Sequence, residues 1–221
     1  ERGEGQGRLS VAIVLYTHLD MLDHRPGDRH VERPERLRAV LDALNDDPNL
    51  ALDPFDAPMV EVEDLLRVHP KAYIDAVFAA APATGRVALD PDTVLSAGSL
   101  AAARRAAGAS VAAVRAVAAG EAERAFCAVR PPGHHAEPGV AMGFCVFSSV
   151  AVAARAAQAV GLQRVAIVDF DVHHGNGTQA VFEHDPTVFV ASIHQSPLYP
   201  GTGDPSETGL GNIANATVPA H

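Results

Sequence analysis

Residues 165–177 read VAIVDFDVHHGNG, and this stretch decides both the fold and the candidate site. Its first half is apolar and β-branched, a pattern typical of a buried strand. In an extended strand alternate residues share a face, so Asp169, Asp171 and His173 are predicted to lie on one side. Two carboxylates and an imidazole cannot be buried there unpaired without a large cost in free energy. We therefore expect metal coordination or a tight hydrogen-bond network at the end of this strand.

The rest of the chain alternates between strand and helix patterns. β-Branched runs predict strands at 11–18, 59–62, 125–130, 165–171, 187–194 and 212–218. Apolar spacing predicts helices at 34–45, 62–68, 70–81, 99–119, 149–160 and 178–183. Ser148 is the expected N-cap of the fifth helix, and the arginines of helix 99–119 are expected to be solvated. This alternation predicts one α/β domain with a mostly parallel, doubly wound sheet between two layers of helices.

The composition narrows the possible function classes. The 221 residues carry a formal net charge of −10, which argues against non-specific nucleic-acid binding and permits cationic substrates. No apolar run of about 18 residues is present, so no membrane span is expected. Cys127 and Cys145 are too few for a disulfide framework, which favours buried thiols in a cytoplasmic protein. Residues 1–10 are expected to be a disordered or trimmed leader, and a homo-oligomer is left open.

Polar segments cluster after the predicted strands, where ligands bind in parallel α/β sheets. These segments are 18–30, 131–144, 169–176 and 194–203. His134 and His135 follow a Pro-Pro-Gly turn, and adjacent histidines can act as a general base near neutral pH. Alone, the pair is explained about equally well by a structural loop. Together with DFDVHHGNG at the next strand end, it indicates a catalytic site. The LDPDT segment at 89–93 could line a site, but ordinary loop structure is the preferred interpretation.

Five segments together resemble the histone deacetylase and acetylpolyamine amidohydrolase family, which has the arginase–deacetylase fold. They are HVERPERL (30–37), RPPGHHA (130–136), GFC (143–145), DFDVHHGNGTQ (169–179) and LYPGTGD (198–204). The likeness extends over about 11–218 and is greatest to bacterial, class II-like amidohydrolases. It implies a three-layer, doubly wound sheet and zinc-dependent removal of the acetyl group from acetyl-lysine or a related acetylated amine.

The resemblance also implies the metal sites. Asp171 and His173 match two of three zinc ligands, and such a site keeps positions open for water and the acetyl carbonyl. A structural monovalent cation, usually K⁺, is expected beside the zinc, largely on backbone oxygens of Asp169, Asp171, His173, Ser192 and Ile193. A second, weaker cation site is expected at Phe182, Asp185 and Val188.

The same resemblance implies roles for the paired histidines. His135 matches the general base that takes a proton from water and returns it to the leaving amine. His134 matches its electrostatic partner, and Asp169 matches the carboxylate that orients His134. Asn176 stands behind His135, where class I enzymes carry a second aspartate. An asparagine carbonyl still accepts the imidazole N–H but brings no charge.

Substrate contacts are implied around these histidines. Phe144 and Tyr199 match the two aromatic walls of a narrow acyl-lysine tunnel. The carbonyl of Gly143 is expected to accept the amide N–H of the substrate. Arg36 matches an arginine beside the acetate exit channel, and a solvated arginine at a helix start is the alternative. For His24, His30, His69, His184 and His194 we expect structural or surface roles.

Two elements of the family pattern are expected beyond His221. These are the third zinc ligand, an aspartate, and a Gly-Gly-Tyr segment whose tyrosine stabilises the oxyanion. In this fold the last two strands lie in the middle of the sheet, and without them an apolar sheet edge would be exposed. Residues 11–221 are therefore expected to be the N-terminal portion of a single deacetylase domain, which is catalytically poor alone.

Three alternatives remain beside the acetyl-lysine deacetylase. An acetylpolyamine deacetylase suits the acidic charge. A non-catalytic fragment that binds acyl-lysine or a partner protein is the second. An arginase-like enzyme with two manganese ions is disfavoured, because Asn176 replaces one of the carboxylates such a centre needs.

Overall fold

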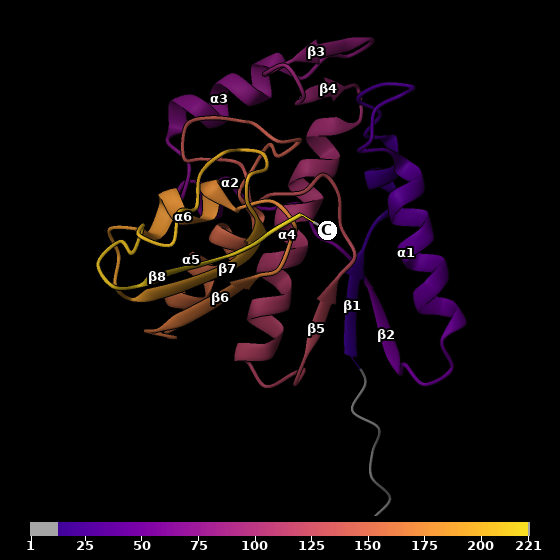
Figure 1. Cartoon of the computed structure of the whole chain (residues 1–221). Coiled ribbons are helices and arrows are strands. Elements are labelled where there is room, and N and C mark those ends of the chain that lie inside the picture. The colour runs from indigo at the N-terminus through magenta and orange to yellow at the C-terminus, as the bar shows by residue number, and fades with distance from the viewer. Residues whose placement is uncertain (1–12, 221) are drawn as a thin grey trace, which may run out of the picture.

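A computed structural model of the chain describes residues 13–220, in which the parallel strands form two three-stranded sheets (Figure 1). The first sheet has the order β2-β1-β5, with β1 at Ile13–Thr17, β2 at Leu52–Asp56 and β5 at Ala125–Cys127. The second has the order β6-β7-β8, with β6 at Val165–Asp169, β7 at Val188–Gln195 and β8 at Ile213–Val218. Every strand pair in both sheets is parallel, which confirms the predicted α/β class.

Helices and one hairpin surround the sheets. The helices are η1 (Leu19–Asp23), α1 (Pro34–Asp46), α2 (Val62–Leu65), α3 (Lys71–Ala80), α4 (Ser99–Ala118), α5 (Ser149–Ala159) and α6 (Asn176–Phe182). The antiparallel hairpin consists of β3 (Arg86–Ala88) and β4 (Val94–Ser96), which flank the LDPDT segment that was interpreted as an ordinary loop. Among the described residues, no helix is both long and apolar enough to cross a bilayer.

Several predicted boundaries need correction. The strand predicted at 59–62 is wrong, and the second strand is β2, which reads LDPFD. β2 pairs with β1 as an edge strand, and four of its five side chains are exposed, so it carries no apolar pattern. β6 ends at Asp169 rather than 171, and the Ser148 side chain makes no capping bond to α5. The predicted leader and the start of the first predicted strand lie outside the described residues.

Helix α4 lies between the two sheets and packs against both β1 and α5 (Figure 1). Arg104 and Arg105 are half-buried, contrary to the prediction, whereas Arg115 is exposed and paired. Arg115 donates to both carboxylate oxygens of Asp64, at 2.8 and 3.1 Å, and Arg105 donates to Asp20 at 3.0 Å. Arg104 donates to a backbone carbonyl. These contacts tie α4 to α2, to η1 and to the loop between β2 and α2.

Helix α4 also approaches the 57–61 loop very closely at Gly108. A Cβ atom there would lie 1.9 Å from the carbonyl oxygen of Pro58. We expect Gly108→Ala to lower the free energy of unfolding by about 1–3 kcal/mol, as overpacking does, despite the better helix propensity of alanine. Urea unfolding measures the change. Gly139→Ala is the matched control, because nothing lies within 4 Å of the added methyl. A variant at least as stable as the parent would contradict the close approach.

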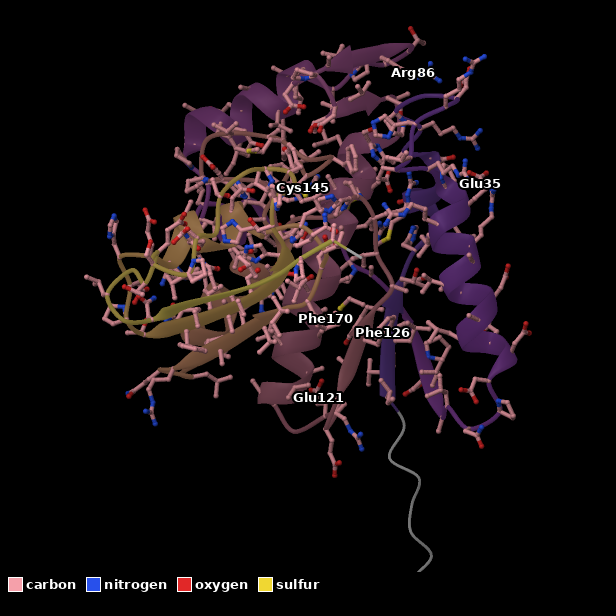
Figure 2. The ribbon with its side chains drawn as sticks, viewed as in Figure 1. Glu35, Arg86, Glu121, Phe126, Cys145 and Phe170 are labelled. Atoms are coloured by element: carbon pink, nitrogen blue, oxygen red, sulfur yellow. The ribbon has the colours of Figure 1, made fainter. Side chains whose placement is uncertain are left out.

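The two sheets share no strand pairing among the described residues. A cleft of about 620 Å³ lies between β5 of the first sheet and β6 of the second. Phe170 lines this cleft and is labelled in Figure 2, and 86% of its surface is exposed. The sheet β6-β7-β8 is covered by α5 and α6 on one face. Its other face is exposed and includes Val168, Phe189 and Ile193. The catalytic candidates lie at the carboxyl ends of β5, β6 and β7.

Candidate active site

The loops that follow these strands enclose a pocket of about 440 Å³. It is lined by residues from five segments of the chain: Arg36, Asp92, Pro132, His134, His135, Gly143, Phe144, Asp171, Val172, His173 and Tyr199. The structure therefore brings together most of the residues singled out in the sequence. Asp169 and Asn176 lie behind the two histidines rather than in the lining. Ser192 is buried in β7, and Ile193 lies on the exposed face of the sheet.

His135 is held by Asn176, the first residue of α6. Its Nδ1 lies 2.8 Å from Oδ1 of Asn176, whose Nδ2 donates to Oε1 of Glu137 at 2.9 Å. Because the amide nitrogen faces a carboxylate, the amide oxygen must face His135. His135 therefore carries its proton on Nδ1, and Nε2 keeps a free lone pair. Burial and then the charge of His134 lower the pKa of His135 to about 4, so this ring is neutral at pH 7.

His134 is held in the same way by a carboxylate. Its Nδ1 lies 2.8 Å from Oδ2 of Asp169, and its ring centroid lies 4.0 Å from that of His135. Burial opposes ionisation of Asp169, but the hydrogen bond and charge of His134 outweigh it, and the pKa of Asp169 is lowered. Gly175 makes this contact possible, because a Cβ atom there would lie 2.4 Å from Oδ2 of Asp169.

Asp171 and His173 lie on a bend after β6, not on an extended strand. Oδ1 of Asp171 accepts the backbone N–H of His173 at 2.8 Å and lies 3.0 Å from its Nδ1. Both side chains still line the same pocket, so the predicted neighbourhood is correct although the strand is shorter. The ring of His173 lies 5.9 Å from that of His135.

The donors of Asp171 and His173 fit one side of a zinc site. Zinc binds oxygen and nitrogen at roughly 2.0–2.1 Å in a tetrahedron, which places two ligands roughly 3.3 Å apart. The 3.0 Å between Oδ1 and Nδ1 is close to that spacing. Within residues 13–220, no group of three histidine, cysteine, aspartate or glutamate side chains is arranged to hold a metal. Asp171 and His173 therefore have the spacing of a ligand pair, and the described residues place no third side chain of this kind beside them.

Phe144 and Tyr199 form two walls of the pocket. Phe144 has φ 69°, and Gly143 before it has φ 57°, which together make a tight turn between Met142 and Cys145. A Cβ atom on Gly143 would lie 2.4 Å from the ring of His135, so only glycine fits there. The ring of Tyr199 lies 5.1 Å from that of His135 and 6.1 Å from that of His173.

Sequence reasoning missed the residues that support this turn. Asp92 Oδ1 accepts the backbone N–H of Gly143, and Thr93 Oγ1 accepts that of Phe144, each at 3.1 Å. Burial and the neighbouring Asp90 raise the pKa of Asp92. Both residues belong to the LDPDT segment that was interpreted as an ordinary loop. The two closely spaced carboxylates of this segment, Asp90 and Asp92, were the sequence feature that could have indicated this role.

The remaining histidines have structural roles. The ring of His30 packs edge-on against Phe144, with centroids 4.9 Å apart. His24, His69 and His194 are buried and hydrogen-bonded, whereas His184 is exposed. These contacts agree with the expectation from the sequence, except that His30 supports a wall of the pocket directly.

A polar network behind the pocket holds the loop that carries Tyr199. Gln179 on α6 donates to Glu207 at 2.6 Å, so its carbonyl oxygen faces Nε2 of His174 at 3.0 Å. His174 Nδ1 then accepts from the hydroxyl of Thr202, 2.8 Å away. Thr202 follows Tyr199 by three residues. The network thus links α6, which also carries Asn176, to the aromatic wall.

Arg36 connects the pocket with a second cavity. It lines the site pocket and also a cavity of about 250 Å³ that includes Glu32, Leu37 and Cys127. The arginine is exposed at the start of α1 rather than paired within either cavity. This position suits the exit channel implied by the resemblance.

Known proteins resemble this chain in both sequence and fold. Residues 30–221 match the family model of the histone deacetylase domain. The chain belongs to the histone deacetylase family. Its fold is shared with the crystal structure of the HDA15 HD domain, with a TM-score of 0.88 and 36% identity over 92% of this chain. The predicted fold family is therefore confirmed.

Two histone deacetylase relatives show how much of the family pattern this chain spans. A probable deacetylase of Archaeoglobus fulgidus is 39% identical over 91% of this chain and 56% of its own length. A histone deacetylase-like amidohydrolase of Pseudomonas aeruginosa is 46% identical over 77% of this chain and 45% of its own length. The HDA15 HD domain is covered over 63% of its chain. The chain thus spans about half the length of these relatives.

Proposed function

We propose that this chain carries the base and two metal ligands of a zinc-dependent deacetylase that hydrolyses the amide of acetyl-lysine or a related acetylated amine. One observation carries the proposal. The tautomer of His135 is set by Asn176, so its free Nε2 belongs to a 440 Å³ pocket that also contains the Asp171 and His173 donors. A base and a metal-ligand pair in one pocket are the parts that metal-assisted hydrolysis needs.

The paired histidines His134 and His135 carry out the proton transfer. With a pKa of about 4, His135 is unprotonated at pH 7 and accepts a proton from the attacking water at Nε2. The resulting imidazolium keeps its Nδ1–H bond to the Asn176 carbonyl and then donates the Nε2 proton to the leaving amine. His134 is hydrogen-bonded to the ionised Asp169. It lies beside His135 and influences the electrostatic environment of that ring.

Asp171 and His173 would hold the zinc ion, together with a ligand from elsewhere. Zinc at such a site supplies Lewis acidity toward the acetyl carbonyl and the attacking water. The chain's remaining residues bind and orient the substrate. Phe144 and Tyr199 flank the apolar stem of the acylated side chain, and the Gly143 carbonyl accepts its amide N–H. Cys145 already donates to that carbonyl at 3.3 Å, and a second lone pair remains for substrate.

Two further features belong to the same proposal. Arg36, which borders both cavities, would sit beside the path by which acetate leaves. A structural K⁺ would lie on oxygens of Asp169, Asp171, His173, Ser192 and Ile193. The pairing of Asp169 with Ser192 across β6 and β7 supports this, because it places Ser192 beside the last residue of β6. The cytoplasmic location expected from the two cysteines stays a prediction.

A metal-controlled assay tests the proposal. Protein freed of metal with a chelator and then given zinc is offered acetyl-lysine peptides, acetylspermidine and acetylputrescine. Turnover that needs zinc and is lost in Asp171→Ala supports the deacetylase. Stoichiometric binding of an acetyl-lysine peptide without turnover, in protein that carries zinc, would instead support the non-catalytic alternative.

An acetylpolyamine deacetylase is the second candidate. Asp92 places a carboxylate in the pocket lining, and the chain carries a net charge of −10. Both features favour a substrate with further positive charges along its length. A higher kcat/KM for acetylspermidine than for acetyl-lysine peptides, falling with salt, would select this candidate.

The pH dependence of catalysis offers a sharper test of the base. Asn176→Asp would place a negative charge on the Nδ1 side of His135 and favour the imidazolium, which raises the pKa of His135 above about 4. Because the unprotonated ring is the active form, the lower limb of the pH–rate profile is expected to move to higher pH. The profile of kcat/KM for parent and variant at equal zinc content measures this shift. An unchanged limb would exclude His135 as the group that titrates.

A further inference from the structure

Three backbone carbonyls converge on one point at the turn between α6 and β7. They belong to Phe182, Asp185 and Val188, which the family resemblance assigns to a second monovalent-cation site. In this chain a side-chain amide occupies the point instead. Nδ2 of Asn212 lies 2.8 Å from the oxygen of Phe182, 3.0 Å from that of Asp185 and 2.8 Å from that of Val188. Asn212 is only 5% exposed, so water does not compete for these carbonyls.

The orientation of the Asn212 amide is determined by its surroundings. Its Oδ1 accepts the backbone N–H of Leu210 at 3.0 Å. Turning the amide over would place Oδ1 against three carbonyl oxygens and Nδ2 against another N–H donor, so every contact would become repulsive. The two hydrogens of the amide are shared among three acceptors, as three-centre hydrogen bonds allow. The amide thus satisfies a cluster of acceptors that otherwise needs a cation or water.

The charge at this turn is already balanced without an added ion. The carboxylate of Asp185 accepts from Nη1 of Arg155 at 2.5 Å and from the hydroxyl of Thr187 at 2.5 Å. The guanidinium of Arg155 also lies over the ring of Phe182, 4.8 Å from its centroid. A cation at the three carbonyls would therefore meet neutral dipoles and a nearby guanidinium, with no uncompensated negative charge to attract it.

We propose that the Asn212 amide permanently takes the place of an alkali cation, so that this chain binds no ion at the turn formed by Phe182, Asp185 and Val188. The carbonyls do not fit a cation here, because their common point is filled by a donor fixed at both ends. The amide also joins the end of α6, the start of β7 and the residue before β8 through hydrogen bonds from a side chain that, unlike an ion, cannot dissociate from the protein. Any K⁺ dependence of this protein is then confined to the site at Asp169 and Ser192. This inference does not depend on the deacetylase activity.

Crystals soaked in rubidium or thallium salts test the inference directly. We expect no anomalous peak at the three carbonyls in the parent protein and a peak there in Asn212→Ala, because the variant vacates the point where the carbonyls converge. A peak in the parent, with Asn212 turned away, would overturn the inference. Absence of a peak in a folded Asn212→Ala protein would overturn it as well, since the amide would then replace no ion. If the variant does not fold, the parent crystals still decide.

Thermal unfolding gives the matching solution test. In tetramethylammonium chloride we expect Asn212→Ala to melt several degrees below the parent, and in potassium chloride to recover part of that loss, because an ion that binds only the native state raises its stability. Asn215→Ala is the matched control, since its amide donates to Gln179 and Glu207 rather than to the three carbonyls. It is expected to gain no K⁺ response beyond that of the parent. Equal K⁺ responses in both variants would contradict the inference, and neither readout uses enzyme activity.

Discussion

Replacing His135 by alanine is expected to lower kcat/KM for deacetylation by roughly 10²–10⁴-fold, the range that a positioned general base contributes. The loss follows from the geometry, because His135 is the histidine whose protonated Nδ1 is bonded to an amide carbonyl and whose Nε2 is left as a base. Its neighbour His134 is hydrogen-bonded to a carboxylate instead, so we do not expect it to replace His135 as the base. Steady-state assays at saturating zinc measure the loss.

The zinc content of His135→Ala separates a lost base from a lost metal. His135 is not one of the two metal donors, so the variant is expected to bind zinc as the parent does. His184→Ala, at an exposed histidine away from the pocket, is the control for replacing an imidazole and should leave kcat/KM unchanged. A His135→Ala protein that keeps a tenth or more of the parental kcat/KM would show that another group serves as the base.

The sequence predicted the strands that carry β-branched residues, including β8, of which only Ile213 is buried, and failed at β2, which reads LDPFD. β7 was found because Val188 and Val190 are buried within an alternating pattern. β2 was missed because four of its five side chains are exposed at the edge of the sheet, and its position is set by backbone pairing with β1. The division of the parallel strands into two sheets was not foreseen either, since side-chain patterns do not report which strands become neighbours.

More of the site than of the fold was predicted, because most of the site residues lie in two short sequence motifs. The DFDVHHGNG and RPPGHH motifs placed Asp169, His134, His135 and Asn176 correctly as neighbours. Glu137 and Asp92 were missed, although each orients a central residue. Both contacts are long-range in the chain, and that of Asp92 also depends on the turn at Gly143, which has no periodic sequence pattern. The zinc and cation assignments stay predictions.

The segment that carries His134 and His135 is anchored by a buried ion pair. Arg130 begins the RPPGHH motif and donates to both oxygens of Glu32, at 2.8 and 2.6 Å, and also to the Met21 carbonyl. Nε2 of His24 lies 3.1 Å from the same carboxylate. Glu32 and Arg130 are 1% and 3% exposed, so the charges compensate each other without help from water. Removing one partner of such a buried pair leaves the other charge uncompensated and strongly destabilises the fold.

Glu32→Gln is therefore expected to lower the free energy of unfolding by about 3–5 kcal/mol, because it leaves the Arg130 guanidinium buried without a counter-charge. Urea unfolding at pH 7 measures the loss. Glu35→Gln is the matched control, in an exposed pair with Arg38 on the surface of α1 (Figure 2), and should cost under about 1 kcal/mol. The double change of Glu32 and Arg130 to methionine should recover much of the loss. Equal effects of Glu32→Gln and Glu35→Gln would contradict the anchoring role.

The acid dependence of stability tests the same pair independently. Burial opposes ionisation of Glu32, but its bonds with His24 and Arg130 outweigh burial and lower its pKa from 4.5 to about 2. Since the native pKa lies below the unfolded value, the ionised carboxylate stabilises the fold above about pH 4.5, and this contribution is lost as the pH falls toward 2. In Glu32→Gln this part of the acid dependence is expected to disappear. A variant that loses stability between pH 4.5 and 2 as steeply as the parent would show that other carboxyl groups govern acid unfolding.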